Sequence, residues 1–294
     1  MQHKITELGC DEVFGDVPAR ISFLLGIEVN QSQVYRTCQN VAGVLEEQDI
    51  NTPCGELLKV MDSEDEQVYA MVDGSMLFTD YGWQETKVGR IFQAEQSADN
   101  EGHKWDMGVS HYTARRGHYS GFTADFEQAL PPQSACQKIF VTDGAAWIGQ
   151  WIAQQYKGAV HILDFFHVCE KLAPLAPKGD VKWLARQKES LLKDGADAVI
   201  AEVTKLRPMH ENVDQVLVYL ENHKHQMDYR YYRQQGWMIG SGAIESAHRT
   251  LLQVRMKRSG QRWADHGCDN MIKLRITIKN GKRELIQNLL KRAA

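Results

Sequence analysis

The spacing of apolar side chains divides the chain into a helical start, a middle part with short apolar runs and a largely helical second half. Residues 1–48 have apolar positions at helical spacing, with a turn at Gly26 and a helix cap at Asn30 or Ser32. This pattern predicts two helices in a helix-turn-helix arrangement. The segment is acidic and helical hairpins are far commoner than DNA-reading ones, so a structural hairpin and a DNA contact both remain open.

Short apolar runs then replace the helical pattern. Residues 49–66 combine Pro, Gly and a charge run, which is typical of a linker. Val68–Val72 predicts a strand that meets Asp73 at its end. Lys87 and Arg90 alternate along a later strand, where they are expected to face solvent. The other predicted elements of this part are strands Thr86–Ala94 and Ser110–Arg116 and a turn at Tyr81-Gly82.

The clearest unit is a strand, a helix and a second strand. Ile139–Val141 predicts a strand ending at Asp143, and the following helix has its apolar residues on one face and stops at Gly158. The stretch "AVHILDFF" predicts the next strand. This order predicts a parallel pair with a right-handed crossover. Residues 167–235 are mostly helical by pattern, and they form an insertion before the helix that carries Glu245.

Charge is distributed unevenly along the chain. The net charge is −4, but residues 246–294 contain 12 Lys and Arg against 3 Asp and Glu, so that residues 1–245 carry −13. The last fifth of the chain is therefore expected either to bind a polyanion or to form a solvated basic helix.

Cysteine spacing and hydropathy exclude several other classes of protein. The six cysteines include no C-x-x-C pair, which excludes a zinc ribbon and indicates no disulfide framework. No apolar run approaches 18 residues, and the start "MQHKITELG" lacks the apolar core of a secretion signal. We expect a cytoplasmic protein without a membrane span.

Three carboxylates lie where an element begins or ends. Asp73 and Asp143 close apolar strands, and Glu245 lies in the first turn of a helix after Gly240-Ser241-Gly242. Ligands collect beyond strand ends in parallel sheets, so these acids would converge if the two strands are neighbours and the helix crosses them. Repulsion between them would be relieved by Mg²⁺ or Mn²⁺, and two such ions can serve phosphodiester chemistry.

Each acid also has a structural interpretation. Asp73-Gly74 fits a simple turn, and Asp143-Gly144 fits a helix N-cap with nothing bound. Glu245 would stabilise a helix N-terminus and would pair with Arg249 at i+4. Spacing alone does not decide between these interpretations and a metal site.

Several motifs in one order point to a family. The stretches "MVDGSML", "GWQETKVGRIF", "VTDGAAWI", "HILDFFHVCEKL" and "IGSGAIESAHRTLLQVRMKRSGQRW" occur in turn over residues 20–280. Together they resemble bacterial insertion-sequence transposases of the ISKra/ISLre type. Those are DDE transposases with an RNase-H-like catalytic domain, similar to the Mutator and hAT groups in carrying a helical insertion before the glutamate. Members are often longer at the N-terminus, so we expect either that this chain is a short or truncated member or that it recognises the element ends with other surfaces.

The resemblance implies a fold and a domain division. The fold is an α/β mixed sheet of RNase-H-like order flanked by helices, with an all-helical insertion and an N-terminal helical region. In that order Asp73 lies on the central first strand and Asp143 on the fourth strand beside it. The parts are an N-terminal helical region (1–62), the first part of the catalytic domain (63–170), the insertion (171–235), and the glutamate helix with its basic tail (236–294).

The resemblance also implies the site residues. Asp73, Asp143 and Glu245 would be the catalytic and metal-binding acids. Asp164 is a rival for the second acid, and with His167 it would form either an accessory metal pair or a pair of structural hydrogen-bonding groups. His248 would orient substrate or serve a structural role. The candidate DNA contacts are Arg249, Arg255, Lys257, Arg258, Arg262 and Trp263, and for Trp263 a packed core indole is the alternative to stacking on a base.

The activity implied is Mg²⁺-dependent cleavage and strand transfer of DNA at the ends of a mobile element. Water would attack the phosphodiester, and the freed 3′-hydroxyl would then attack target DNA. The expected partners are transposon-end and target DNA and a second copy in a homodimer or higher homo-oligomer, in a bacterial, nucleoid-associated setting. The rivals are a structure-selective nuclease of the same fold and an inactive DNA-binding remnant. A nucleotide-binding module lacks a Gly-rich phosphate loop.

Overall fold

A five-stranded mixed sheet forms the centre of the molecule. The computed structural model describes residues 1–96, 105–207 and 211–292. The strands are β1 (Gln67–Thr79), β2 (Gly82–Gln96), β3 (Trp105–Arg116), β4 (Gln137–Thr142) and β5 (Val160–Leu163). Their order is β3-β2-β1-β4-β5, with β1 antiparallel to β2 and parallel to β4. The expected α/β fold with RNase-H-like order is confirmed.

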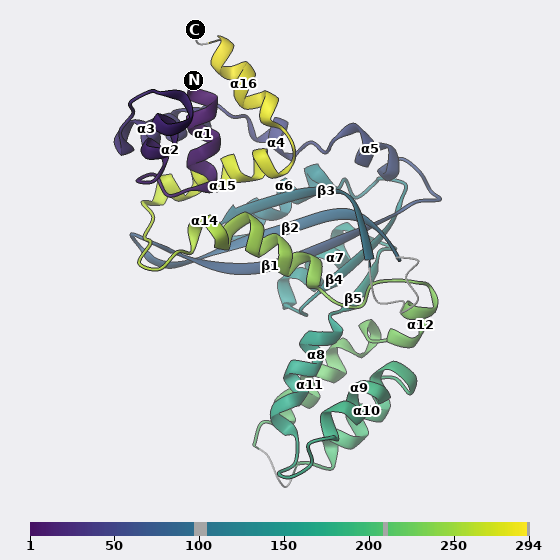
Figure 1. Ribbon diagram of the computed structural model, residues 1–294. Coiled ribbons are helices and arrows are strands. Elements are labelled where there is room, and N and C mark those ends of the chain that lie inside the picture. The colour runs from purple at the N-terminus through teal and green to yellow at the C-terminus, as the bar shows by residue number, and fades with distance from the viewer. Residues whose placement is uncertain (97–104, 208–210, 293–294) are drawn as a thin grey trace.

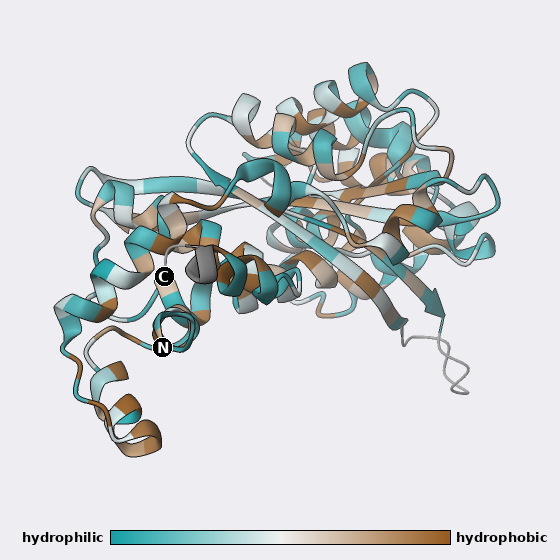
Figure 2. Ribbon diagram, turned by 90° about the horizontal axis from the view of Figure 1, so that it is seen from above, coloured by the Kyte–Doolittle hydropathy of each residue, from teal (hydrophilic) through white to brown (hydrophobic). Residues whose placement is uncertain are grey.

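Both faces of the sheet are covered, which explains why β1 reads as an almost continuous apolar run. Side chains alternate along a strand, so Tyr69 and Met71 enter one core while Val68 and Ala70 enter the other. Figure 2 shows hydrophobic colour along the strands where helices cover them. The central strand is therefore held from both sides, and the residues at its end are held with it.

Helices from distant parts of the chain make up the two covering layers (Figure 1). One core includes side chains of α5 (Gly55–Met61), α6 (Tyr119–Ala129) and α7 (Ala146–Gln155). The other includes α1 (Gln2–Asp11), α2 (Val17–Leu25), α3 (Gln31–Gly43) and α15 (Asp265–Lys279). The helix that carries Glu245 also belongs to this second layer, as α13 (Gly242–Ala247), the π-helical turn η3 (His248–Gln253) and α14 (Val254–Met256). The last helix is α16 (Arg283–Arg292).

The helical insertion projects away from the sheet between β5 and α13 (Figure 1). Its helices are α8 (Phe165–Leu172), α9 (Trp183–Lys193), α10 (Ala196–Thr204), α11 (Val213–His223) and α12 (Tyr229–Gln234), with short 3₁₀ turns η1 (Ala173–Leu175) and η2 (Lys224–Gln226). The predicted strand over "AVHILDFF" is too long. It ends at Leu163, because the Asp164 carboxylate accepts a hydrogen bond from the Phe166 amide (2.8 Å) and begins α8.

The two helices predicted near the N-terminus, with a turn at Gly26 and a cap at Asn30, are confirmed. Gly26 ends α2 in the left-handed conformation, and Asn30 begins α3 with a reciprocal capping box to Gln33. The predicted linker over residues 49–66 is wrong, because it contains α4 (Glu47–Asn51) and α5.

Buried cations on β2 correct a second expectation. Lys87 and Arg90 are 6% and 7% exposed instead of facing solvent. The Lys87 ammonium contacts Glu85 (2.7 Å) and donates to the Gly117 carbonyl (2.6 Å). Each charge is therefore buried with partners that offset its loss of water.

No helix in the described ranges has the length and apolar character needed to cross a membrane. The six cysteines are all free.

Gly89 tests how tightly the sheet packs. A Cβ at Gly89 would lie 2.6 Å from the Phe126 ring and 2.6 Å from the Thr113 hydroxyl. We expect Gly89→Ala to lower the free energy of unfolding by about 1–3 kcal/mol, because the core around the ring cannot yield without strain. Urea unfolding measures the change. The matched control is Gly43→Ala at the end of α3, where nothing lies within 4 Å, and equal stability losses in both variants would contradict the packing.

Candidate active site

Strand register brings the first two acids to one edge of the sheet. The parallel pairing of β1 with β4 ends at Met71 opposite Val141, so Asp73 and Asp143 each lie two residues beyond the last pair. β1 itself continues to Thr79, with Gly74 paired to β2, so the expectation that the strand stops at Asp73 and the alternative of a simple Asp73-Gly74 turn are both wrong. The two carboxylates therefore leave neighbouring strands at the same level.

The third acid is positioned by hydrogen bonds that fasten segment 237–243 across the sheet. The Phe165 amide donates to the Ile239 carbonyl (2.9 Å) at the start of α8. From β2, the buried Arg90 guanidinium donates to the Ala243 carbonyl (3.1 Å) in the first turn of α13. Because α13 packs on both β1 and β2, its N-terminal turn lies over the sheet, in the same cavity as Asp73 and Asp143.

One cavity of about 210 Å³ collects the acids. Carboxylates from β1, the β4–α7 connection, α8 and α13 line it, namely Asp73, Asp143, Asp164, Glu170 and Glu245. Asp73 and Glu245 also line an adjoining cavity of about 550 Å³, together with His248 and Arg249. Acids separated by 70 and 102 residues along the chain thus share one concave surface.

Asp73 is held from two sides. Its Oδ1 accepts a hydrogen bond from the Gly74 amide (2.6 Å), and its Oδ2 lies 3.2 Å from Nε2 of His248. The His248 contact has the distance of an ion pair but lacks the alignment of a hydrogen bond. Burial alone would raise the pKa of Asp73, but His248, the Gly74 amide and His167 together hold that pKa below its usual range. Asp73 is therefore kept as a carboxylate.

The carboxylate of Asp143 is held by a hydrogen bond, whereas that of Glu245 is not. The Asp143 Oδ1 accepts from the Ala145 amide (3.0 Å), so the predicted capping role is met in part, although Ala145 is itself the N-cap of α7. Glu245 is exposed, and its carboxylate makes no hydrogen bond or ion pair with any described residue. Glu245 and Arg249 are both among the described residues and form no ion pair there, so that predicted pairing is not found. Glu245 is thus free to turn toward a ligand.

Asp164 has a structural position. One oxygen caps α8, and the other accepts a hydrogen bond from the Ser241 hydroxyl, so both are occupied and the residue is 5% exposed. It follows β5, which is separated from β1 by β4. Its neighbour His167 lies 3.7 Å from the Glu170 carboxylate and lines the same cavity. Asp164 joins α8 to the Gly240-Ser241-Gly242 loop, and Asp143 is the acid beside Asp73.

The donor chemistry of the cavity fits a hard divalent cation. Asp73, Asp143 and Glu245 offer carboxylate oxygens, the ligands that Mg²⁺ and Mn²⁺ prefer, and the cation keeps several waters. As the side chains stand, no three His, Cys, Asp or Glu groups among the described residues come close enough to hold one ion. A divalent cation would bind here only after some of these side chains rotate.

Two predicted DNA contacts are corrected by burial. Arg255 is 1% exposed, donates to the Gly9 carbonyl (3.1 Å), and lies over the rings of Phe14 and Trp263. Trp263 is also buried and donates from its indole to the Met256 carbonyl (3.0 Å). Neither side chain can reach a phosphate or a base. Trp263 is therefore a packed core residue, as the alternative to stacking on a base predicted.

The other predicted cations are on the surface. Arg249 is exposed and lines the larger cavity beside the acids. The Lys257 ammonium donates to the Ser75 hydroxyl (3.0 Å), two residues along β1 from Asp73. Arg262 forms an ion pair with Asp80 (2.8 Å), and Arg258 donates to the Val254 carbonyl (3.1 Å). The following helix α15 is not a solvated basic helix, since much of its surface is buried.

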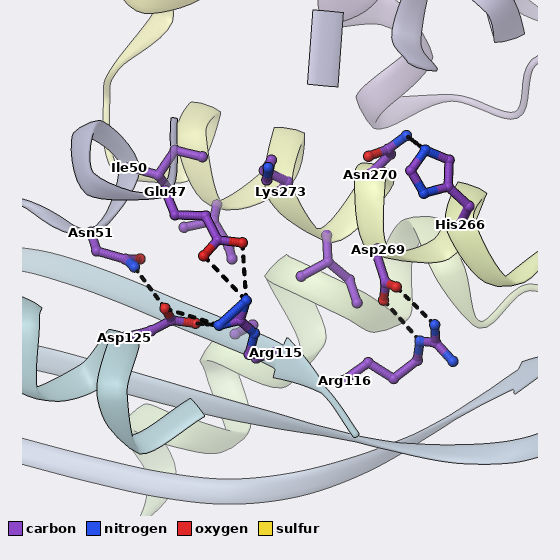
Figure 3. A pocket seen from close by; sticks show the side chains of 13 residues that line it. Glu47, Ile50, Asn51, Arg115, Arg116, Asp125, His266, Asp269, Asn270 and Lys273 are labelled. Atoms are coloured by element: carbon purple, nitrogen blue, oxygen red, sulfur yellow. Dashed lines mark hydrogen bonds and ion pairs between the residues drawn. The ribbon is translucent and has the colours of Figure 1, made fainter. Parts of the chain in front are cut away.

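A separate cavity of about 260 Å³ lies between β3, α4, α6 and α15, and its charged residues connect these elements to one another (Figure 3). Arg115 forms ion pairs with Glu47 (3.0 Å) and Asp125 (3.1 Å). Arg116 pairs with Asp269 (2.8 Å). Both arginines are thus occupied by carboxylates of the surrounding helices, and the cavity offers no free pair of charges for a ligand.

Three residues that support the site were missed. Arg90 was expected in solvent, while Ser241 and Tyr219 were not singled out. Tyr219 donates from its hydroxyl to the Asp143 backbone carbonyl (3.1 Å), which fixes the β4–α7 connection from the insertion. The place of Ser241 directly before the helix that carries Glu245 is a signal that could have identified it. No local pattern identifies Arg90 or Tyr219, because their partners lie far away in the sequence.

The fold and the acids define an RNase-H-like α/β protein with a carboxylate cavity where the pairing of β1 with β4 ends. Residues 122–292 match the family model described as Uncharacterised protein family (UPF0236), and this match spans more than half of the chain. The chain belongs to that family. No curated protein matches it.

His161 links the second acid's strand to the insertion. Its Nε2 lies 2.8 Å from the Thr142 hydroxyl, and its Nδ1 lies 2.9 Å from the Gln226 amide nitrogen. Burial, followed by the nearby His223 and His225, lowers the pKa of His161 to about 4. The folded chain therefore binds fewer protons than the unfolded chain between pH 6.5 and about 4.

The low pKa of His161 makes the stability of the fold depend on pH. The contribution of His161 to stability is complete above the unfolded pKa near 6.5 and is lost as pH falls toward 4. In urea unfolding between pH 6.5 and 4.5, His161→Gln should remove about 1.4 kcal/mol per pH unit from the slope of stability against pH. The exposed His225→Gln is the control. An unchanged slope in the His161 variant would show that this histidine protonates in the folded state.

Proposed function

We propose that this chain is a DDE transposase of the ISKra/ISLre type, acting on DNA at the ends of an insertion sequence. The observation that carries the proposal is the shared cavity of Asp73, Asp143 and Glu245, formed from three distant segments on a sheet of RNase-H-like order. Carboxylates at adjoining strand ends are suited to divalent cations. The DNA ends, the target and a second protomer are the proposed partners.

Each acid has a separate task. Asp73 on β1 and Asp143 directly after β4 would hold cations, and Glu245 would close the site from α13. The bound Mg²⁺ or Mn²⁺ would supply a Lewis acid that stabilises charge at the reacting phosphate. Arg249, exposed beside Asp73 and Glu245, would bind a neighbouring phosphate and orient the strand. The protein thus contributes positioning and electrostatic stabilisation, without a covalent nucleophile.

Isosteric variants of the acids test the proposal. Asp73→Asn, Asp143→Asn and Glu245→Gln should each lower Mg²⁺-dependent cutting of element-end DNA by about a hundredfold or more, because charge at the reacting phosphate is no longer stabilised. DNA affinity should stay the same or rise. The control is Glu202→Gln on α10, an exposed acid paired with Lys205, which should cut normally.

Different outcomes separate the rivals. Full cutting by one acid variant would remove that residue from the site. Hydrolysis by the wild type without strand joining would favour a structure-selective nuclease. DNA binding without cutting of any tested duplex would favour an inactive remnant.

Variants of the exposed Arg249 and the buried Arg255 distinguish a residue that contacts DNA from one that stabilises the fold. Arg249→Ala should weaken DNA binding about three- to tenfold and make the slope of log affinity against log salt less steep by about 0.9, because one phosphate contact is lost. Fluorescence anisotropy over a salt series measures both. Arg255→Met should leave the slope unchanged while lowering the free energy of unfolding by about 1–3 kcal/mol. The reverse pattern would contradict the placement of these two residues.

A further inference from the structure

His248 is a buried polar side chain with one polar contact among the described residues. Its side chain is 5% exposed, and neither ring nitrogen has a hydrogen-bond partner. The contact that remains is the 3.2 Å approach of Nε2 to Oδ2 of Asp73. Burying an imidazole with so little compensation costs free energy, so its position needs a reason beyond packing.

The two cavities show what this contact does to Asp73. Asp73 lines both of them, but Asp143 lines only the smaller and His248 only the larger. His248 therefore draws one Asp73 oxygen toward the side that Asp143 does not share. The other oxygen is engaged by the Gly74 amide (2.6 Å). Both Asp73 oxygens are thus engaged, and no three of the described His, Cys, Asp or Glu groups converge on one ion.

The helix geometry places His248 where it can act on Asp73. His248 begins the π-helical turn η3, three residues after Glu245 on the same helix. π-helical turns inside α-helices occur frequently at functional sites, because they shift the side chains on one face. The result here is that one helix brings both Glu245 and His248 to the cavity that Asp73 also lines. His248 is confined by burial, while the Asp73 side chain is 39% exposed and has room to turn.

We propose that His248 is a positioning residue that holds Asp73 away from Asp143 and competes with a divalent cation for its carboxylate. The inference rests on the proposed function, since it takes Asp73 and Asp143 as ligands. When a cation is absent, Nε2 of His248 stays beside the Asp73 carboxylate in the acidic cavity. When a cation is bound, Asp73 turns toward Asp143 and the contact to His248 is given up. The imperfect alignment of the contact makes this exchange easy.

Mn²⁺ binding to the full chain, measured by titration calorimetry without DNA, tests the competition. His248→Leu keeps the apolar volume and removes the nitrogen, so it should bind Mn²⁺ about three- to tenfold more tightly than the wild type. His248→Gln keeps a polar donor and should stay within about twofold of the wild type. The matched control is His111→Gln, a buried histidine that lies near Asn280 and away from the acids. It should leave Mn²⁺ affinity unchanged.

The outcomes distinguish this inference from the proposed function. Unchanged or weaker Mn²⁺ binding by folded His248→Leu, while Asp73→Asn still loses binding, overturns the competition and leaves the cation site standing. No Mn²⁺ binding by the wild type, or full binding by Asp73→Asn, overturns both. A structural role of His248 alone would not tighten metal binding.

A measurement on the wild-type chain covers the case in which the leucine variant does not fold. In proton–carbon spectra of the histidine rings, the His248 signal, assigned by its loss in His248→Gln, should shift on addition of Mg²⁺. The same addition to Asp73→Asn should leave that signal in place. A His248 signal that ignores Mg²⁺ in a wild type that binds Mn²⁺ overturns the inference.

Discussion

The parallel pairing of β1 with β4 is the constraint on which the rest of the site depends. Because the last pair is Met71 with Val141, Asp73 and Asp143 emerge at the same level from adjacent strands. A shift of one residue in either strand would turn one of the two carboxylates to the opposite face of the sheet. The apolar cores on both faces specify this register, since each requires its own alternate set of β1 side chains. Burial of the central strand thereby fixes the position of Asp73 relative to Asp143 on the neighbouring strand.

Buried arginines complete the site by holding the Glu245 helix in place. Arg90 reaches from β2 to the Ala243 carbonyl, and Arg255 and Arg275 bind main-chain carbonyls of α1 from the other end of the same layer. Burial lowers the pKa of Arg255 to about 10, which still leaves it charged at neutral pH. Carbonyl oxygens and aromatic faces offset the loss of water around these cations. Basic residues in the last fifth of the chain therefore serve two purposes: some anchor the helix, and others face the solvent beside the acids.

Sequence patterns predicted the fold well where the signal is local. The strand–helix–strand unit around Asp143, the helical insertion and the position of Glu245 in a first helical turn are all found in the structure. The patterns failed where burial depends on distant partners. Arg255 and Trp263 follow Glu245 within a basic stretch, and only the N-terminal helices packed against them show that they are interior. The residues 49–66 form helices because Leu57 and Met61 find a core supplied by the sheet.

The convergence of the three acids on a cation is the central claim, and it can be tested by locating the ion directly. Crystals of the full chain soaked in Mn²⁺ should give an anomalous difference peak in the cavity, within coordination distance of Asp73, Asp143 and Glu245 carboxylate oxygens. An anomalous map without a peak in that cavity, or with peaks only at acids elsewhere on the surface, would contradict the account.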